Sequence, residues 1–569
     1  MMDDKQPEPS KSKTLIPEVL GLQSRKSGKA GAQRKTVLFA VSEYGEFFSL
    51  LDIAKLLEIE LNLHPVFLFK ADYGALNTHS RLLEALNFSW TTAHSIHEKF
   101  DASGLEPGVN DYVPSALRSS GLSTVGVDNT NSKRTGVDPI LFQMYSFFLY
   151  LKDRLKRRRG RGDNENSQKN AAPGLVVEQF YRRMLDRVSA VIQDFNPQII
   201  ISGQDYPLSI TSMAALAGSK QGIKTVIIPF SMTPTTKEIA ESFFGSRTNE
   251  LKSRFEQIWI AKYLAPWLHQ YRGRFYIRLS PMEALASNRL GLTPLQPWTP
   301  NSGRGIVFAP SQQGYDYALS AGIPKDQLQL TGALWSDKLI ALGATREQRR
   351  NELIRDILVF ETYARNVARS KTIQRSSKPV KVDAEDQQKT LLIFSWPPNQ
   401  SPRRPNGFLT FDEMNKALAE MLIALAMSAP VKIAISLHPT LLNTPLGAEL
   451  KAAGLYIIDK PLIDVIDCSN VFCATVSSTL MWSLQAGIPS VNFDIYSYGY
   501  SEFVKAGMRE AKTISNLRNE LLLMIEDTAK RESVISDIIE KRDYWTSLDG
   551  GAAEKIVGSI RKLLSPVTN

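Results

Sequence analysis

Residues 469–494 read SNVFCATVSSTLMWSLQAGIPSVNFD. A run of strand-forming residues ends at Ser477, Ser478 and Thr479, a helix-like stretch follows over 478–486, and Gly-Ile-Pro then opens a second apolar run. This order predicts a strand, a helix and a second strand parallel to the first. The three hydroxyls fall where the first strand passes into the helix, and that position bears directly on function.

The same alternation of strand and helix patterns runs along most of the chain. In the N-terminal half it predicts strands at 35–41, 64–69, 197–203, 224–230, 304–310 and 326–332, with helices at 42–61, 176–195, 208–221 and 314–321. In the C-terminal half it predicts strands at 389–396, 431–437 and 455–459 and a helix at 445–453. The fold class is therefore α/β, with two Rossmann-like domains built on parallel sheets.

One helix of the C-terminal half can be read in more detail. Thr410 and Glu413 form a capping-box pattern that marks the start of a helix. The residues that follow place apolar side chains at the spacing of one helix face, namely Met414, Leu418, Met421, Leu422 and Leu425. We expect this face to be buried.

Domain boundaries follow from changes in composition. Residues 1–33 are polar and are expected to form a disordered tail. The N-terminal domain is expected at 34–343, with an insert at about 100–172. The charged stretch 344–388 is expected to be a linker, and 389–569 to form the C-terminal domain together with terminal helices.

Composition excludes several classes of protein. The chain has 569 residues, of which 43% are hydrophobic and 22% charged, as in ordinary soluble globular proteins. Cys468 and Cys473 are too few for a disulfide framework, which favours a reducing cytoplasm. His94 and His97 lack an evident third ligand, so no metal site is expected. No apolar run reaches the length of roughly 18–20 residues that a membrane-spanning helix needs.

The net charge of +10 and the isoelectric point near 9.2 favour an anionic partner. The densest basic cluster, at 152–162, directly follows the apolar and aromatic stretch 139–151. Residues 139–161 could therefore contact an anionic membrane surface. The alternative is a helix packed on the domain core that ends in a solvated basic loop. Nucleic-acid binding is not expected, because no nucleic-acid-binding motif accompanies the charge.

Two features fall at predicted strand ends, where ligands bind in doubly wound sheets. His438 and Pro439 follow the strand at 431–437, so that an imidazole emerges where proline stops the sheet. Ser477, Ser478 and Thr479 would lie at a helix start, where free N–H groups and hydroxyls suit a phosphate. Plain N-capping is the alternative, and it explains one hydroxyl better than three.

These features together resemble the nucleotide-binding domain of GT-B enzymes. The resemblance is carried by SLHP (436–439), ATVSST (474–479) and AGIPSVNFD (486–494), with LTGALWSDKL (330–339) and IISGQDYP (200–207) upstream. Similar arrangements occur in bacterial sialyl- and Kdo-transferases, glycerophosphotransferases of teichoic acid synthesis and UDP-N-acetylglucosamine 2-epimerases. The acidic Asp-Asp/Glu-Gly motif of the sialyltransferases is absent near any candidate strand end, since LDGG (548–551) lies in the terminal region. SEYGE (42–46) does not match the arginine- and glutamate-bearing loop of the epimerases.

The resemblance implies two domains that face each other across a cleft and a transfer reaction that needs no metal. It places the leaving nucleotide phosphate at His438, Pro439 and the hydroxyls of 477–479. Arg403 and Arg404, in the loop after the strand at 389–396, become candidates for further phosphate pairing, because guanidinium groups bind phosphate through two hydrogen bonds. A solvated basic loop is the alternative for these two arginines.

The transfer also requires a base on the opposing domain to take a proton from the acceptor hydroxyl. Asp205 and Glu43 are the candidates, since both lie just beyond predicted strands. Asp205 follows a strand with a nearly continuous apolar run, which predicts a central position and makes it the first choice. The alternative for Asp205 is a helix N-cap for the stretch that begins near Pro207.

The function expected from the sequence is that of a metal-independent glycosyltransferase of bacterial surface-polysaccharide synthesis. It would move a sugar or a polyol phosphate from a nucleotide-activated donor to a glycan or lipid-linked acceptor, with no cofactor. We expect the protein in the cytoplasm, with peripheral attachment to the inner membrane as an additional expectation. Two alternatives stay open: a nucleotide-sugar 2-epimerase or hydrolase, and a non-catalytic GT-B subunit of a polysaccharide assembly complex.

Overall fold

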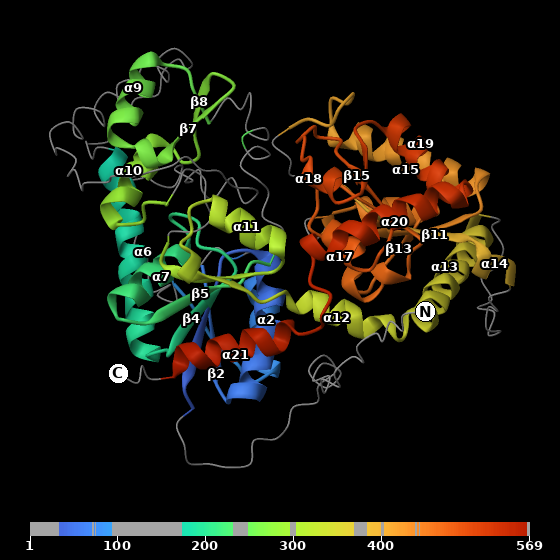
Figure 1. The fold of residues 1–569 in the computed structure, drawn as a ribbon. Helices are drawn as coiled ribbons and strands as arrows, with labels where there is room; N and C mark the ends of the chain where they lie inside the picture. The colour runs from blue at the N-terminus through green and yellow to red at the C-terminus, as the bar shows by residue number, and fades with distance from the viewer. Residues whose placement is uncertain are drawn as a thin grey trace, which may run out of the picture.

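Two α/β domains, each built around a parallel sheet, make up the computed structural model of the chain (Figure 1). The structure describes residues 34–70, 73, 75–93, 173–230, 240, 249–295, 303–368, 384–399, 403–438, 441–442 and 444–565. The predicted tail at 1–33 and the predicted insert at about 100–172, which contains the stretch 139–161, lie outside these ranges. The expected fold class, with two Rossmann-like domains, is confirmed.

The N-terminal domain contains a sheet of seven parallel strands in the order β10-β9-β5-β4-β1-β2-β3. All six predicted strands of this half are present, with ends that differ by a few residues. Only the short edge strand β3 has no counterpart among the strands predicted there. The strands are β1 (Thr36–Val41), β2 (His64–Phe69), β3 (Ser89–Thr92), β4 (Ile199–Ser202), β5 (Lys224–Ile227), β9 (Gly305–Ala309) and β10 (Leu328–Leu330).

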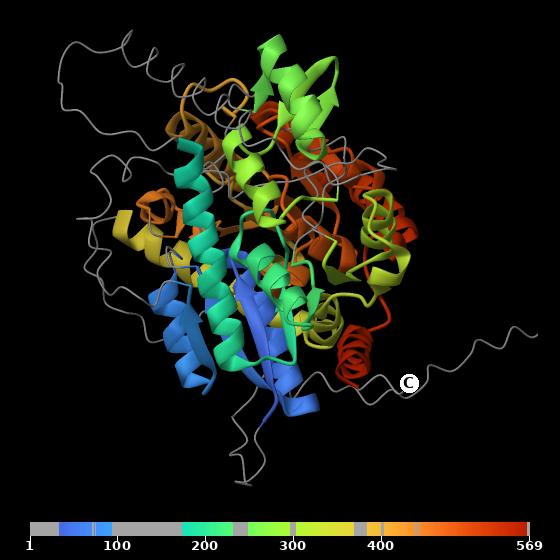
Figure 2. The same cartoon turned by 90° about the vertical axis from the view of Figure 1, so that its left-hand side faces the viewer.

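Helices cover both faces of this sheet, because its central strands are apolar on both sides. Val37 and Phe39 of β1 pack on one face with helices α2 (Tyr44–Leu61), α3 (Leu76–Ala85) and α21 (Ala552–Leu564). Leu38 and Ala40 pack on the other face with α6 (Pro173–Phe195), α7 (Ile210–Lys220) and α10 (Pro281–Leu290). Figure 2 shows α6 and α7 in front of the strands. Helix α11 (Gln312–Ser320) and the turn η3 (Lys325–Gln327) connect β9 to β10.

A small antiparallel unit rises from the N-terminal domain, at the top of Figure 1. It contains strands β6 (Glu250–Leu251), β7 (Leu268–Tyr271) and β8 (Arg274–Ile277) in the order β6-β8-β7, with helix α9 (Arg254–Tyr263) and the turn η2 (Ala265–Trp267). The sequence analysis did not predict it. Strands of two to four residues are too short to show a clear alternation of apolar and polar positions.

The C-terminal domain contains a sheet of six parallel strands in the order β13-β12-β11-β14-β15-β16. Its strands are β11 (Thr390–Ser395), β12 (Val431–Ser436), β13 (Tyr456–Ile457), β14 (Val471–Ala474), β15 (Ser490–Phe493) and β16 (Arg509–Ala511). Its helices and 3-10 turns are α14 (Ala384–Gln388), α15 (Phe411–Ser428), α16 (Leu446–Ala452), η5 (Leu462–Asp464), η6 (Ile466–Cys468), α17 (Thr479–Gln485), α18 (Glu502–Lys505), α19 (Ile514–Glu526) and α20 (Thr528–Trp545). The strand-helix-strand order predicted for 469–494 is confirmed.

Helix α15 bears out the detailed prediction for its residues. The Thr410 hydroxyl accepts a hydrogen bond from the Glu413 N–H at 3.1 Å and so caps the helix. The Glu413 carboxylate accepts its return bond from Leu409 N–H, one residue earlier than in a standard capping box. The buried side chains of the helix are the five predicted from its spacing.

The structure corrects two of the predicted domain boundaries. The stretch expected to be a linker contains helix α13 (Arg346–Ala368), and its Leu353 and Ile357 are buried in the core of the C-terminal domain. Helix α13 contains so many charged residues that its buried apolar face is not evident from the sequence. The last helix, α21, was assigned to the C-terminal domain but packs on the N-terminal sheet through Ile556 and Ile560.

The return of α21 to the N-terminal domain depends on helix α12 (Leu334–Gly343), which runs between the domains in Figure 1. The Asp337 carboxylate accepts hydrogen bonds from Ala552 N–H at 3.2 Å and Ala553 N–H at 2.8 Å, and thereby caps α21. Gly332 has a φ of 80°, and a Cβ at this position would lie 2.7 Å from Ser547 Oγ. The segment that returns from the C-terminal domain to α21 therefore passes Gly332 so closely that only glycine fits at this crossing point.

Within the described ranges, no helix has both the length and the apolar character needed to cross a bilayer. The predicted membrane contact at 139–161 stays a prediction.

The crossing point yields a stability prediction. Gly332→Ala forces a Cβ against Ser547 and Ala552 at 2.7–3.0 Å in addition to straining the backbone, whereas Gly273, with a φ of 73°, has open space around it. We expect Gly332→Ala to lower the free energy of unfolding by roughly 2–5 kcal/mol and Gly273→Ala by about 1–2 kcal/mol. Urea unfolding of both variants measures this difference, and equal losses would mean that the crossing point is not tightly packed.

Candidate active site

Each sheet reverses its strand order at one point, and ligands bind beyond the carboxyl ends of the strands at such a point. In the N-terminal sheet this point lies between β1 and β4, and in the C-terminal sheet between β11 and β14. The loops that leave these strands begin at Ser42, Gly203, Trp396 and Thr475. Most of the site residues predicted from the sequence lie in or beside these loops.

The loop between β14 and α17 contains the three hydroxyls noted in the sequence. The Ser477 hydroxyl accepts hydrogen bonds from Thr479 N–H at 3.3 Å and from the Thr479 hydroxyl at 2.9 Å. Ser478 occupies the N-cap position but makes no capping bond through its side chain. The hydroxyls of Ser477 and Thr479 therefore hydrogen-bond to each other at the helix start, and the hydroxyl of Ser478 is available to a ligand.

The backbone of this loop is strained. Val476, a β-branched residue, has a φ of 44°, and its N–H donates to Asn492 Oδ1 at 3.0 Å. Thr475 Oγ1 and Asn492 Nδ2 are buried beside this bond without a hydrogen-bond partner in the described part of the chain. Strained backbone and unpaired buried polar atoms cost free energy and persist only where the surrounding structure holds them in place. Such features are concentrated at functional sites.

His438 follows β12, as predicted, and its side chain is half-buried. Burial lowers the pKa of this imidazole, so the neutral form predominates near pH 7. The ends of β12 and β14 flank that of β11, which places His438 and Ser477 at the same edge of the sheet with one strand between them. Pro439 lies outside the described residues.

Arg403 and Arg404 lie in the loop after β11, as the sequence suggested. Arg403 donates to the carbonyl of Ser497, and its Cζ lies 5.5 Å from the ring centroid of Tyr498. Arg403 therefore helps to join the loop after β11 to the loop after β15. Arg404 is exposed. Phosphate binding by these arginines stays a prediction.

On the N-terminal side, the central group is one that the sequence analysis missed. Glu46 is fully buried, and its carboxylate accepts hydrogen bonds from Ser42 N–H at 2.7 Å, the Ser42 hydroxyl at 2.9 Å and Gly203 N–H at 2.7 Å. These bonds join the ends of β1 and β4. Burial raises the pKa of Glu46 to about 7, although the hydrogen bonds from Ser42 and Gly203 act to lower it. The sequence signal was an acidic residue in the first helical turn after a buried strand.

Glu43 lies at the N-cap of α2, at the carboxyl end of β1, and is partly exposed. Burial raises the pKa of its carboxyl, while a hydrogen bond from the Gln204 side chain and the charges of Arg278 and Lys70 lower it. Gln204 also donates to the Ser42 hydroxyl at 3.3 Å. Glu43 and Glu46 are thus linked through Gln204 and Ser42.

Asp205 lies after β4, as predicted, but it is fully buried. Burial lowers the pKa of Arg304, and the charge of Asp205 acts to raise it. Asp205 and Arg304 therefore lie near each other. The alternative role of Asp205 as a helix N-cap is wrong. Ser209 caps α7 instead, because its hydroxyl accepts from Ser212 N–H at 3.1 Å.

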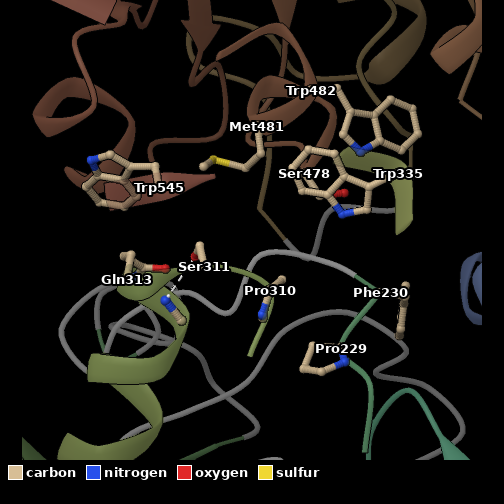
Figure 3. A pocket seen from close by; sticks show the side chains of 11 residues that line it. Pro229, Phe230, Pro310, Ser311, Gln313, Trp335, Ser478, Met481, Trp482 and Trp545 are labelled. Carbon is tan, nitrogen blue, oxygen red and sulfur yellow. Dashed lines mark hydrogen bonds between the residues drawn. The ribbon is translucent and has the colours of Figure 1, made fainter. Parts of the chain in front are cut away.

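A pocket lies between the two domains, with about 460 Å³ of space that includes the open solvent at its mouth (Figure 3). Residues that follow β5 and β9, together with residues of α11, face α12, the start of α17 and the end of α20 across the pocket. The pocket is lined by Pro229, Phe230, Pro310, Ser311, Gln313, Gly314, Trp335, Ser478, Met481, Trp482 and Trp545. The predicted site residue Ser478 is among them, whereas the three tryptophans were not predicted.

Phe230 connects this pocket to the crevice between β1 and β4. A Cβ at Gly203 would lie 2.7 Å from Phe230 Cδ1, and a Cβ at Gly45 would lie 3.4 Å from Phe230 Cε2. The Phe230 ring therefore lies against the first turn of α2, which follows Glu43 and contains Glu46, and against the loop after β4, and it also lines the pocket. Ser478 of the C-terminal domain and Phe230 of the N-terminal domain thus line one inter-domain pocket.

Comparison with known proteins gave no match to any family model or to any curated protein. Among solved structures, UDP-GlcNAc 2-epimerase from Neisseria meningitidis, bound to UDP-GlcNAc, is 12% identical with a TM-score of 0.44, over 93% of this chain and 100% of that one. UDP-GlcNAc 2-epimerase from Methanocaldococcus jannaschii, in complex with UDP-GlcNAc and UDP, is 13% identical with a TM-score of 0.43, over 93% and 99%.

A third similar structure is CalG4, the calicheamicin glycosyltransferase, which is 12% identical with a TM-score of 0.45 over 95% of this chain and 100% of that one. Two of these structures are epimerases and one is a glycosyltransferase. The order of the strands in the two sheets establishes the architecture independently of them: two Rossmann-like domains that face each other across a cleft, as in the GT-B fold.

Proposed function

We propose that the chain is a glycosyltransferase that binds a nucleotide-activated donor in the cleft between its domains. The observation that carries the proposal is the pocket at the cleft, which joins Ser478 and Trp482 of the C-terminal domain to Phe230 of the N-terminal domain. A donor bound there would lie between the candidate phosphate-binding loop and the candidate bases. The acceptor would be a glycan or a lipid-linked glycan.

The chemistry of the pocket walls supports a nucleotide sugar. Indole rings such as those of Trp335 and Trp482 stack on planar bases and on the apolar faces of sugar rings. Ser478 offers a hydroxyl for the donor phosphate, and the neutral imidazole of His438 lies at the same sheet edge. The net charge of +10 favours the approach of such an anionic donor.

The transfer step needs a base for the acceptor hydroxyl. The oxygen of the acceptor hydroxyl forms a bond to the anomeric carbon of the donor, and the bond from that carbon to the phosphate oxygen breaks. The proton of the acceptor hydroxyl passes to the base. Glu43 suits this role better than Asp205, because Glu43 is partly exposed at the crevice while Asp205 is fully buried. This reverses the order of preference expected from the sequence.

The assay must also distinguish the two alternative functions. Nucleotide release that requires a glycan acceptor supports the transferase. Release without an acceptor would instead identify an epimerase or hydrolase, and binding without turnover would identify a non-catalytic subunit.

Nucleotide binding in the tryptophan-lined pocket is tested by thermal shift with CMP, UDP and CDP. At least one nucleotide should raise the melting temperature, since a ligand that binds only the folded state stabilises it. Trp482→Ala should weaken that nucleotide about tenfold, because loss of a stacking partner costs roughly 1–1.5 kcal/mol. Trp90→Ala is the control, because Trp90 lies on the edge strand β3 and donates to Glu84 at 3.1 Å. The pocket assignment fails if no nucleotide shifts the wild type, or if both variants respond equally.

The identity of the base is tested by Glu43→Gln and Asp205→Asn, assayed for transfer with the nucleotide sugar that binds. Glu43→Gln should lower turnover by about 10²-fold or more, the usual scale for a lost general base, while nucleotide affinity stays unchanged. Asp205→Asn should mainly lower stability. Full activity in Glu43→Gln together with its loss in Asp205→Asn would show that Asp205 is the base.

The pH dependence of the wild type gives a second measure of the same role. A base must be deprotonated to act, so activity should fall as the pH drops through the Glu43 pKa, which burial raises above the ordinary value of 4.5. This acid limb should disappear from the residual activity of Glu43→Gln. An unchanged acid limb in the variant would assign the titration to another group.

A further inference from the structure

Arg278 reaches the catalytic crevice from the small antiparallel unit. It follows β8, and its Cζ lies 4.0 Å from the ring centroid of Tyr206, in the loop after β4. Tyr206 also forms a side-chain hydrogen bond with Arg278, and the charge of Glu43 acts on the guanidinium. Tyr206 therefore holds Arg278 at the loop after β4, where the charge of the candidate base Glu43 acts on it.

The guanidinium of Arg278 is incompletely paired. Its Nη1 is buried and has no hydrogen-bond partner within the described ranges, and no ion pair there joins it to Glu43. A buried donor left without an acceptor costs free energy, and a cationic donor costs more than a neutral one. Arg278 as a whole is partly exposed, so a ligand in the crevice can approach its guanidinium.

Two other partly buried arginines are paired with carboxylates. Arg349 donates to both carboxylate oxygens of Asp467 at 2.7 and 2.6 Å. Arg289 pairs with Glu178 at 2.9 Å. Arg278 differs from these two because the carboxylate whose charge acts on it, Glu43, is the group we propose as the base.

The charge around Glu43 is consistent with an anionic ligand. Lys70, at the end of β2, and Arg278 both act on Glu43. Two cations thus face a single partly exposed carboxylate at this edge of the N-terminal sheet. An acceptor whose hydroxyl reaches Glu43 would place its neighbouring groups beside these cations, and an anionic group there would satisfy the unpaired donor of Arg278.

We propose that Arg278 binds a phosphate or carboxylate group of the acceptor, so that the acceptor class is a phosphorylated or acidic glycan. This proposal rests on the proposed transfer function, since it concerns the acceptor side of the same cleft. Phosphate and carboxylate both match the planar fork of guanidinium donors, and the experiment distinguishes them.

The test is isothermal titration calorimetry with inorganic phosphate and with acetate, on the full chain saturated with whichever of CMP, UDP or CDP binds. Phosphate, acetate or both should bind the wild type, and Arg278→Gln should weaken that binding about tenfold or more. Arg278→Lys keeps the charge but not the fork, and it should weaken binding less. Arg274→Gln is the matched control, because Arg274 lies on the same strand unit and pairs with Glu250 at the surface at 3.3 Å, and it should bind as the wild type does.

The outcomes separate this proposal from the proposed function. Stronger binding of phosphate than of acetate would identify a phosphorylated acceptor, and the reverse an acidic one. Equal affinity in the wild type and Arg278→Gln would overturn the proposal. If no nucleotide binds but anion binding still depends on Arg278, the proposed anion site stands and the proposed transferase function is overturned. Should Arg278→Gln fail to fold, equal affinity in Arg278→Lys and the wild type would overturn the proposal.

Discussion

A single buried carboxylate, that of Glu46, holds together the part of the molecule on which the proposed function depends. It accepts hydrogen bonds from the backbone at the ends of both β1 and β4, the two strands between which the N-terminal sheet reverses its order. The bonds fix the start of α2 and therefore the position of Glu43. They also explain Gly203, where a Cβ would lie 2.9 Å from Glu46 Cγ and 2.7 Å from Phe230.

The geometry extends from this point across the cleft. Phe230 packs against Gly203 and also lines the inter-domain pocket, opposite the first turn of α17. Helix α12 supplies Trp335 to the same pocket and Asp337 to the cap of α21. The same elements, among them α12 and the segment after β5, thus join the two domains and line the proposed donor site.

Much of the fold could be predicted from the sequence because local signals determine it. The buried central strands appear as nearly continuous apolar runs, and the five buried residues of α15 follow from helix periodicity. The positions of Glu43 and Asp205 at strand ends could be predicted as well. A parallel sheet places every such residue at one edge, whatever its partners are.

What the sequence could not predict depends on contacts between distant residues. Asp205 and Glu43 look alike in sequence, but only the folded chain shows that the first is fully buried and the second partly exposed. In the sequence, Glu46 is an ordinary acidic residue in the first turn of a helix. Only the folded structure shows that Gly203 N–H, 157 residues away, donates to it. The pocket tryptophans come from three separate helices, and α21 packs on a sheet formed by the other end of the chain.

Hydrogen–deuterium exchange with and without the nucleotide that stabilises the protein tests the central claim most directly, namely that the donor binds between the domains. Binding in the cleft should slow exchange both in the β14–α17 loop at 475–482 and in the facing loops at 228–230 and 310–314. Protection confined to one domain, or centred on surfaces away from these loops, would contradict a donor site shared by the two domains.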